Sequence, residues 1–198
     1  GYLPIFLSEP WRRNAVGEDA GAWGMSNVAS FQIEVDIDAG ATNPTLSGFA
    51  EFDAVQLPLT DIIMWEKQTV PANGSGTVTL NTLPRVANEF YQRFHCFEGA
   101  DGHIKAVDVK VGRQPAKVLK DAENNAKLLA DGYTPQSAVF PIVFDNTQRW
   151  SDALSMVKAN GQVVSEFRLD FEMNTGATDF VLFIEKRGTP DNVATAAV

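Results

Sequence analysis

The stretch FRLDFEM, residues Phe167–Met173, decides the fold class, because apolar and polar side chains alternate along it without a break. Successive side chains of a β-strand point to opposite faces, so one face of this segment is apolar and the other is charged. The pattern returns at Ile104–Val111 and at residues 28–38, where Phe31, Ile33, Val35 and Ile37 alternate with polar and acidic side chains. These three segments predict half-buried strands.

Shorter apolar segments predict further strands over residues 3–7, 46–52, 59–68, 76–80, 89–97, 138–144 and 180–186. The intervals between them are rich in Gly, Pro, Asn and Asp, which favour turns. Pro44 keeps Asn43 out of the helical region, so the strand that begins at residue 28 must end before it. Many short strands at this spacing indicate an all-β sandwich or barrel. A doubly wound α/β fold is not expected, because it needs a helix after nearly every strand.

Two segments favour helices in the long connections of this sandwich. Residues 115–130 carry apolar side chains at helical spacing, and Pro115 suits the first turn. Glu123 and Lys127 form a favourable i,i+4 pair, and Gly132 can end the helix in a left-handed conformation. A second helix is expected over residues 148–158.

The composition excludes several classes of protein. Sixteen Lys and Arg against 25 Asp and Glu give a formal net charge of −9, so we expect no contact with nucleic acid, whose phosphates attract clustered cations. The single cysteine, Cys96, cannot form an intrachain disulfide, and no paired cysteines offer a structural zinc site. No apolar run is long enough to cross a bilayer and no signal peptide is evident, so we expect a soluble protein.

Catalytic signatures are absent from the sequence. There is no nucleophile elbow, no zinc-binding HExxH, no phosphate-binding loop and no dinucleotide fingerprint. His95 and Cys96 are adjacent on a predicted strand, so their side chains point to opposite faces and cannot form a thiol–imidazole pair. His103 follows Asp101-Gly102 and is expected in an exposed turn. We therefore expect no catalytic, cofactor-binding or metal-binding residue.

One alternative rests on carboxylates that share strand faces, namely Glu34, Asp36, Asp38, Asp170 and Glu172. If these faces lined a concave surface, two carboxylates would flank a sugar as acid and nucleophile, with tryptophans as stacking platforms. That arrangement predicts a jelly-roll carbohydrate-binding module or glycosidase. The same carboxylates are candidate ligands for a structural Ca²⁺, a cation that takes several oxygen ligands. The simpler interpretation is a solvated sheet face.

Three blocks of sequence are specific enough to resemble a known family. They are LPIFLSEPW at residues 3–11, FQIEVDID at residues 31–38 and NPTLS at residues 43–47. They closely resemble the major capsid protein of corticoviruses, which are tailless icosahedral phages with an internal membrane. The order of the later elements is similar too, and the resemblance extends to about residue 187.

The resemblance implies a double jelly roll, in which two sandwiches stand side by side in one subunit. Residues 1–55 would be later strands of a first jelly roll, residues 56–187 the second jelly roll, and residues 188–198 a flexible tail. The first block lies well inside the first jelly roll in the family, so early strands are missing here: the chain is a fragment, or another polypeptide completes that sandwich. The matching motif positions, expected to determine fold and interfaces, are Pro10, Trp11, Asp36, Asp38, Asn43 and Pro44.

The function that the resemblance implies is structural, without enzymatic activity. Three subunits would form a pseudo-hexagonal capsomer, and capsomers would meet laterally in an icosahedral shell around an internal membrane. The expected partners are other copies of the chain, other virion proteins and the inner membrane. The expected location is the virion capsid, assembled in the cytoplasm of a host bacterium. A minor or vertex protein of the same virion is a second alternative.

Overall fold

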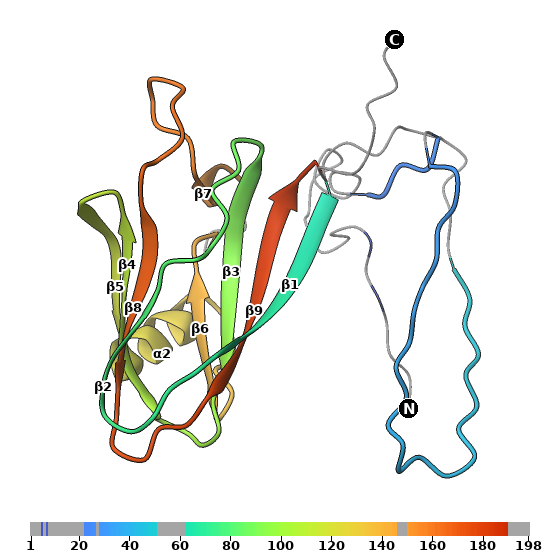
Figure 1. Cartoon of the computed structure of the whole chain (residues 1–198), viewed down its shortest axis with the longest axis horizontal. Coiled ribbons are helices and arrows are strands. Elements are labelled where there is room, and N and C mark those ends of the chain that lie inside the picture. Colours follow the sequence, from blue (N-terminus) through green and yellow to red (C-terminus); the bar gives the residue numbers. More distant parts are fainter. Residues whose placement is uncertain are drawn as a thin grey trace.

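The computed structural model describes residues 5, 7, 22–26, 28–50, 62–145 and 150–189. Within residues 62–189, two antiparallel sheets pack face to face as a sandwich (Figure 1). The larger sheet has the order β1-β9-β3-β6, with β7 pairing to β3: β1 (Ile62–Val70), β9 (Phe180–Gly188), β3 (Glu89–Phe97), β6 (Val139–Val143) and β7 (Leu154–Ser155). The smaller sheet has the order β2-β8-β4-β5: β2 (Gly76–Leu80), β8 (Phe167–Met173), β4 (Ile104–Val111) and β5 (Gln114–Lys120).

The connections between the two sheets define the topology. Consecutive strands β1 and β2 enter different sheets, and so do β3 and β4, while β8 and β9 return to lie between earlier strands. Leaving aside the two-residue β7, four strands in each sheet, joined in this way, make an eight-stranded jelly roll.

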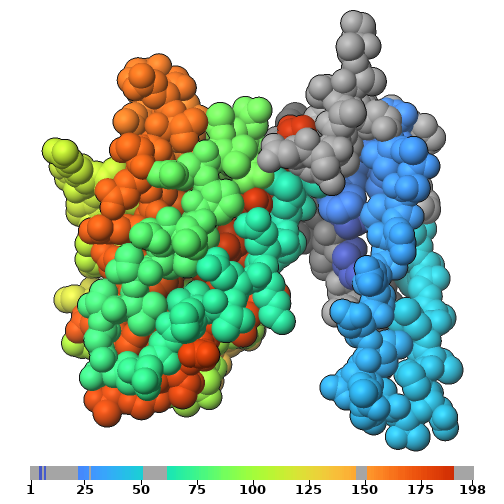
Figure 2. Space-filling model, viewed as in Figure 1, coloured from blue at the N-terminus to red at the C-terminus, as the bar shows by residue number. Residues whose placement is uncertain are grey.

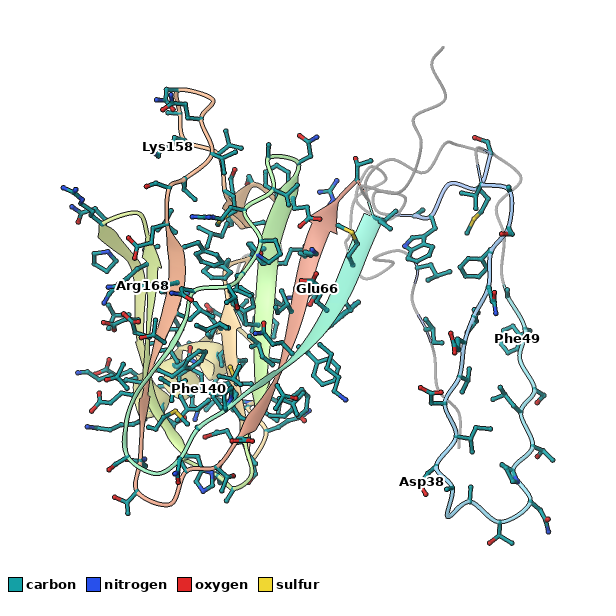
Figure 3. The ribbon with its side chains drawn as sticks, viewed as in Figure 1. Asp38, Phe49, Glu66, Phe140, Lys158 and Arg168 are labelled. Carbon is teal, nitrogen blue, oxygen red and sulfur yellow. The ribbon has the colours of Figure 1, made fainter. Side chains whose placement is uncertain are left out.

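The core fills the space between the two inner faces. Every second side chain of β8 is buried, as expected from its alternation. Phe171 contacts Phe180 of β9 edge to face, with ring centroids 5.0 Å apart, so the two sheets are joined by aromatic packing. Phe140 of β6, labelled in Figure 3, enters the same core. The largest fully buried side chains are Tyr91, Phe94, Phe140, Phe167, Phe171 and Phe180.

Most predicted strands of the sandwich are confirmed. The strands over residues 76–80, 89–97, 104–111 and 167–173 have the predicted bounds. The strand expected over residues 138–144 begins only at Val139, because Ala138 has a positive φ of 58° that an extended strand excludes. The strand expected over residues 180–186 continues to Gly188. Of the strand expected over residues 59–68, residues 59–61 lie outside the described residues, and β1 runs to Val70.

The helix predicted over residues 115–130 is wrong in its first part. The structure has β5 up to Lys120 and the helix α2 only over Asp121–Ala130. Pro115 is tolerated because β5 is an edge strand, where its missing N–H costs no ladder hydrogen bond. The expected end is confirmed: Gly132 has φ 87° and donates to the Leu129 carbonyl at 3.1 Å. Glu123 pairs with Lys120 at 3.4 Å instead of with Lys127.

The helix predicted over residues 148–158 is also wrong where the structure describes it. Only the single 3-10 turn η1 (Trp150–Asp152) is helical. Leu154 and Ser155 instead pair with β3, and Val157 bridges to Val163 across a turn at Gly161. Hydrogen bonds to a neighbouring strand outweigh a weak local helix preference. Among the described residues, no helix is long and apolar enough to cross a membrane.

Residues 28–50 form two extended segments joined by a turn at residues 38–41 (Figure 1). The turn is the predicted one: Ala41 donates to the Asp38 carbonyl at 3.0 Å. The strands expected over residues 28–38 and 46–52 are not assigned within this described segment, although its backbone is extended. Residues 51 and 52, and most of the strand expected over residues 3–7, lie outside the described residues.

Candidate functional site

The motif residues cluster at the turn of the 28–50 segment. The carboxylate of Asp38 accepts a hydrogen bond of 2.6 Å from the Gly40 amide, which fixes the turn. Asn43 has φ 49°, so it avoids the right-handed helical region before Pro44, as expected. Asp36 is exposed on the neighbouring extended segment. These residues shape a turn, and Pro10 and Trp11 lie outside the described residues.

The apolar row of residues 31–37 is open to solvent. The exposed fractions of these side chains are 45 to 59%, for Phe31, Ile33, Val35 and Ile37. On the second extended segment, Leu46 is 71% and Phe49 76% exposed. Figure 3 shows Phe49 on the second extended segment and Asp38 at the turn. Trp23 covers only part of Phe31, with ring centroids 5.8 Å apart. A continuous apolar row of this kind marks a surface that another structure covers.

Ion pairs cover the outer face of the smaller sheet. Lys110 Nζ lies 2.7 Å from Asp170 and 3.8 Å from Asp108. Arg168, labelled in Figure 3, adds a contact of 3.3 Å to Asp170. Lys105 pairs with Glu172 farther along the same strands. This face is therefore charged but locally neutralised, as a solvated sheet face is.

These contacts bear on the glycosidase alternative, in which Asp170 is a candidate acid. Burial raises the pKa of Asp170, but hydrogen bonds from Lys110 and Thr79 and the charge of Arg168 outweigh it and lower the pKa below its ordinary value. A general acid needs a raised pKa instead. Glu172, its neighbour on the face, is held by Lys105. Glu34, Asp36 and Asp38 are exposed and belong to the 28–50 segment, apart from the strands that carry Asp170 and Glu172.

A groove of about 610 Å³ lies on the outer face of the larger sheet. Its floor comes from β1, β9, β3 and β6, and its far wall comes from α2 and the loop after it. Asn124 of α2 donates to the Pro141 carbonyl at 2.7 Å, which holds that wall against β6. Aromatic and apolar side chains dominate the lining: Trp65, Phe97, Phe183, Tyr133, Leu128 and Pro135.

Charged groups lie beneath this apolar lining. Arg93 makes two hydrogen bonds of 2.9 Å to Asp145, whose side chain is fully buried. Glu185, 3% exposed, lies 3.7 Å from Arg93 Nη1 and 3.8 Å from His95 Nε2, both longer than a hydrogen bond. Two carboxylates thus share one guanidinium. Of these four side chains, Arg93 and His95 line the groove, whereas the buried Asp145 and Glu185 do not.

The two histidines and the cysteine form no nucleophilic centre. Cys96 is fully buried in the core, and burial raises the pKa of its thiol far above neutrality. His95 points the other way and stacks on Trp65, with centroids 5.8 Å apart, as strand alternation predicts. His103 is half-buried instead of exposed in its turn. Within the described ranges, no group of three His, Cys, Asp or Glu side chains can hold a metal ion.

Sequence reasoning missed the groove and its charges. Trp65 is 57% exposed on the outer face of the larger sheet, and no alternation in residues 59–68 predicts an aromatic groove there. The side chains of Trp11 and Trp150 lie outside the part of the chain that the structure describes. Arg93 and Asp145 are 52 residues apart, and no local pattern joins them. The available signal was the run His95-Cys96-Phe97, in which both outward positions are aromatic where a solvated strand would carry charge.

Two family models match the chain. The viral coat protein P2 N-terminal domain matches residues 1–53, and the viral coat protein P2 C-terminal domain matches residues 62–186. Among solved structures, the chain resembles the major capsid protein P2 from Bacteriophage PM2, with a TM-score of 0.61 and 17% identity over 71% of this chain and 50% of that one. It also resembles the STIV MCP, with a TM-score of 0.51 and 14% identity over 70% of this chain and 45% of that one.

These similarities establish the fold. They confirm the all-β jelly-roll architecture that the alternating segments predict, in a chain that matches double jelly-roll proteins. No curated protein sequence matches the chain. The chain spans about half the length of the two solved proteins.

Proposed function

Because the chain belongs to the viral coat protein P2 family, and is thus a coat protein and not an enzyme, we propose that it is a major capsid protein that acts by self-assembly. The observation that carries this proposal is the match of both family domains, in order, to one chain. The sandwich is a rigid block with broad outer faces, which suits packing against other copies. Such a role requires no catalytic groups.

We place the chain's domains as residues 1–55, later strands of a first jelly roll, and residues 56–187, the second jelly roll. The two family matches, with a break between residues 53 and 62, support this division. The exposed row at residues 31–37 supports it too, because strands of a sandwich turn such a row inward against a facing sheet. The tail expected over residues 188–198 overlaps β9 at Gly188, and residues 190–198 lie outside the described residues.

Three subunits, each with the second jelly roll and the later strands of a first one, would place six blocks around one axis, which is the basis for a pseudo-hexagonal homotrimer. Lateral contacts between such capsomers would close an icosahedral shell. The shell would surround an internal membrane, contact other virion proteins and assemble in the host bacterial cytoplasm. Nucleic acid would not be a direct partner, because the chain carries a net charge of −9.

The solution mass of the full chain tests the proposal. Light scattering coupled to gel filtration, over a hundredfold range of concentration, should give a trimer or larger closed particles. Repeating it without and with millimolar Ca²⁺ tests whether a cation contributes to the contacts. A chain that stays monomeric at every concentration in both buffers would contradict self-assembly.

Copy number separates the major capsid protein from a minor or vertex protein of the same virion. Quantitative mass spectrometry of purified particles should find this chain as the most abundant protein. A stoichiometry of a few copies per five-fold vertex would assign it to the vertex instead.

A further inference from the structure

The groove on the outer face of the larger sheet has the size and lining of a small-ligand site. Its volume of about 610 Å³ falls within the roughly 300–1,000 Å³ of such sites, which are mostly apolar with a few polar groups. The outer face of the smaller sheet is instead covered by ion pairs such as Lys110–Asp170. In the loop that walls the groove, Thr134 and Gln136 are exposed and add polar groups to its aromatic lining.

Trp65 provides a flat apolar surface in this groove. It belongs to β1, the edge strand that lies in turquoise at the surface of the sandwich in Figure 2. Its ring stacks on His95, with centroids 5.8 Å apart and planes inclined by 23°, yet 57% of Trp65 is exposed. The faces of an aromatic ring are negative, and the C–H groups on one face of a pyranose are weakly positive, so the two surfaces attract each other. An exposed indole therefore suits a sugar ring.

Two polar atoms of the lining have no hydrogen-bond partner within the described part of the chain. They are the hydroxyl oxygen of Tyr133 and Nε2 of His95, and both atoms are buried. His95 Nε2 lies 3.8 Å from Glu185, which is too far for a hydrogen bond. Because unpartnered polar groups are costly beneath an apolar molecule, these atoms favour a ligand with hydroxyl groups over a lipid chain.

The charges around the groove favour a neutral ligand. The guanidinium of Arg93 donates two hydrogen bonds of 2.9 Å to the buried Asp145, and Glu185 lies 3.7 Å from it. An anionic ligand would meet a guanidinium whose charge these two carboxylates already neutralise. A cationic ligand would meet Arg93 itself and Lys67, whose Nζ lies 5.8 Å from the centroid of the Phe183 ring. Neither sign of charge is complementary to the lining.

We propose that the groove binds a neutral sugar residue of an oligosaccharide, which stacks on Trp65 and directs its hydroxyl groups toward Tyr133 and Gln136. An extended peptide fits less well, because the floor of the groove is the face of a sheet and offers no free strand edge to pair with. The proposal goes beyond self-assembly and does not depend on it.

An array of immobilised oligosaccharides, probed with the full chain, tests the ligand class. The array should carry neutral oligosaccharides that end in glucose, galactose, mannose or N-acetylglucosamine, together with sialylated and sulfated ones. At least one neutral oligosaccharide should retain the chain, and its sulfated form should retain it less. Retention by no neutral oligosaccharide, or by charged ones alone, would overturn the proposal. So would binding of a proline decapeptide in place of every sugar.

Titration with the soluble form of a retained oligosaccharide, by isothermal calorimetry, tests the site. Trp65→Ala should weaken binding by roughly tenfold, through loss of the stacking surface. Tyr133→Phe keeps the ring and removes only the unpartnered hydroxyl, so it should weaken binding by roughly threefold without lowering the thermal midpoint. Phe49→Ala is the control, because Phe49 is 76% exposed but lies outside the groove, and it should bind as wild type does. Wild-type affinity in both groove variants would overturn the assignment to this groove.

Discussion

Lys186 Nζ donates a hydrogen bond of 2.8 Å to the carboxylate of Glu89, and both side chains are buried. Glu66 lies 3.2 Å from the same ammonium, so one lysine of β9 pairs with a carboxylate on each neighbouring strand, β3 and β1. Burial lowers the pKa of Lys186, but the hydrogen bond to Glu89 and the charge of Glu66 outweigh it and raise the pKa. The ion cluster therefore fixes the register of three strands.

Lys186→Met should lower the free energy of unfolding by about 3–5 kcal/mol, because it leaves Glu89 buried without its partner. Chemical denaturation followed by tryptophan fluorescence measures the change. Lys158→Met, at an exposed loop position, is the control and should shift stability by no more than about 0.5 kcal/mol. Equal stability of the two variants would show that the buried pair contributes nothing.

Gly188 ends β9 where two backbones approach closely. A Cβ at this position would lie 2.3 Å from the Asn88 carbonyl oxygen and 3.1 Å from Glu89 Cα, and neither is the movable end of a side chain. Gly188→Ala should therefore destabilise the sandwich by about 1–3 kcal/mol, lowering its thermal midpoint. Gly48→Ala is the matched control, since nothing lies within 4 Å of the added atom. An unchanged midpoint for Gly188→Ala would show that the strand end relaxes freely.

Asp170 predicts a pH dependence of stability. Its lowered pKa means that its ion pairs stabilise the fold above the ordinary value near 3.8, and that this stabilisation is lost as the pH falls through the lower folded value. Asp170→Asn should thus be less stable than wild type at pH 7, by about 1 kcal/mol or less, and the difference should shrink below pH 4. Thermal melts of both proteins from pH 7 to pH 2.5 measure it.

The control for this experiment is Asp108→Asn, because Asp108 lies 3.8 Å from Lys110 where Asp170 lies 2.7 Å away. It should reduce stability less than Asp170→Asn at pH 7. A gap between wild type and Asp170→Asn that widens on acidification would reverse the assignment.

The sequence predicts the sandwich well because its strands carry their own signal. In β8, apolar side chains such as Phe171 are buried on one face and polar side chains face solvent on the other. This alternation is present in the sequence, so the strand can be predicted from its residues alone. The errors fall where local preference and tertiary pairing disagree. Residues 115–120 read as helix, yet β4 offers them ladder hydrogen bonds, and Leu154 pairs with Tyr91 although its surroundings favour a helix.

The groove could not be predicted in the same way. It forms where α2 docks on β6, through the hydrogen bond from Asn124 to Pro141 and the burial of Leu128, and neither contact has a periodic signature. The charges near it come from β3, β9 and the second residue after β6, brought together only by strand order. The turn after the segment that ends at Asp38 is predictable, because the Asp38–Gly40 hydrogen bond forms within three residues of sequence.

The open row at residues 31–37 provides the last prediction. If a facing sheet covers this row in the assembled capsomer, a charge introduced there must lose its hydration on assembly, which is costly. The row lies outside the sandwich of residues 62–189, so the same charge should not affect the stability of that sandwich. Ile33, 59% exposed, should therefore tolerate Ile33→Lys with an unchanged thermal midpoint but lose assembly by light scattering. Gln32→Lys adds the same charge on the opposite face and should assemble normally. Assembly of Ile33→Lys at the wild-type level would show that this row stays open in the capsomer.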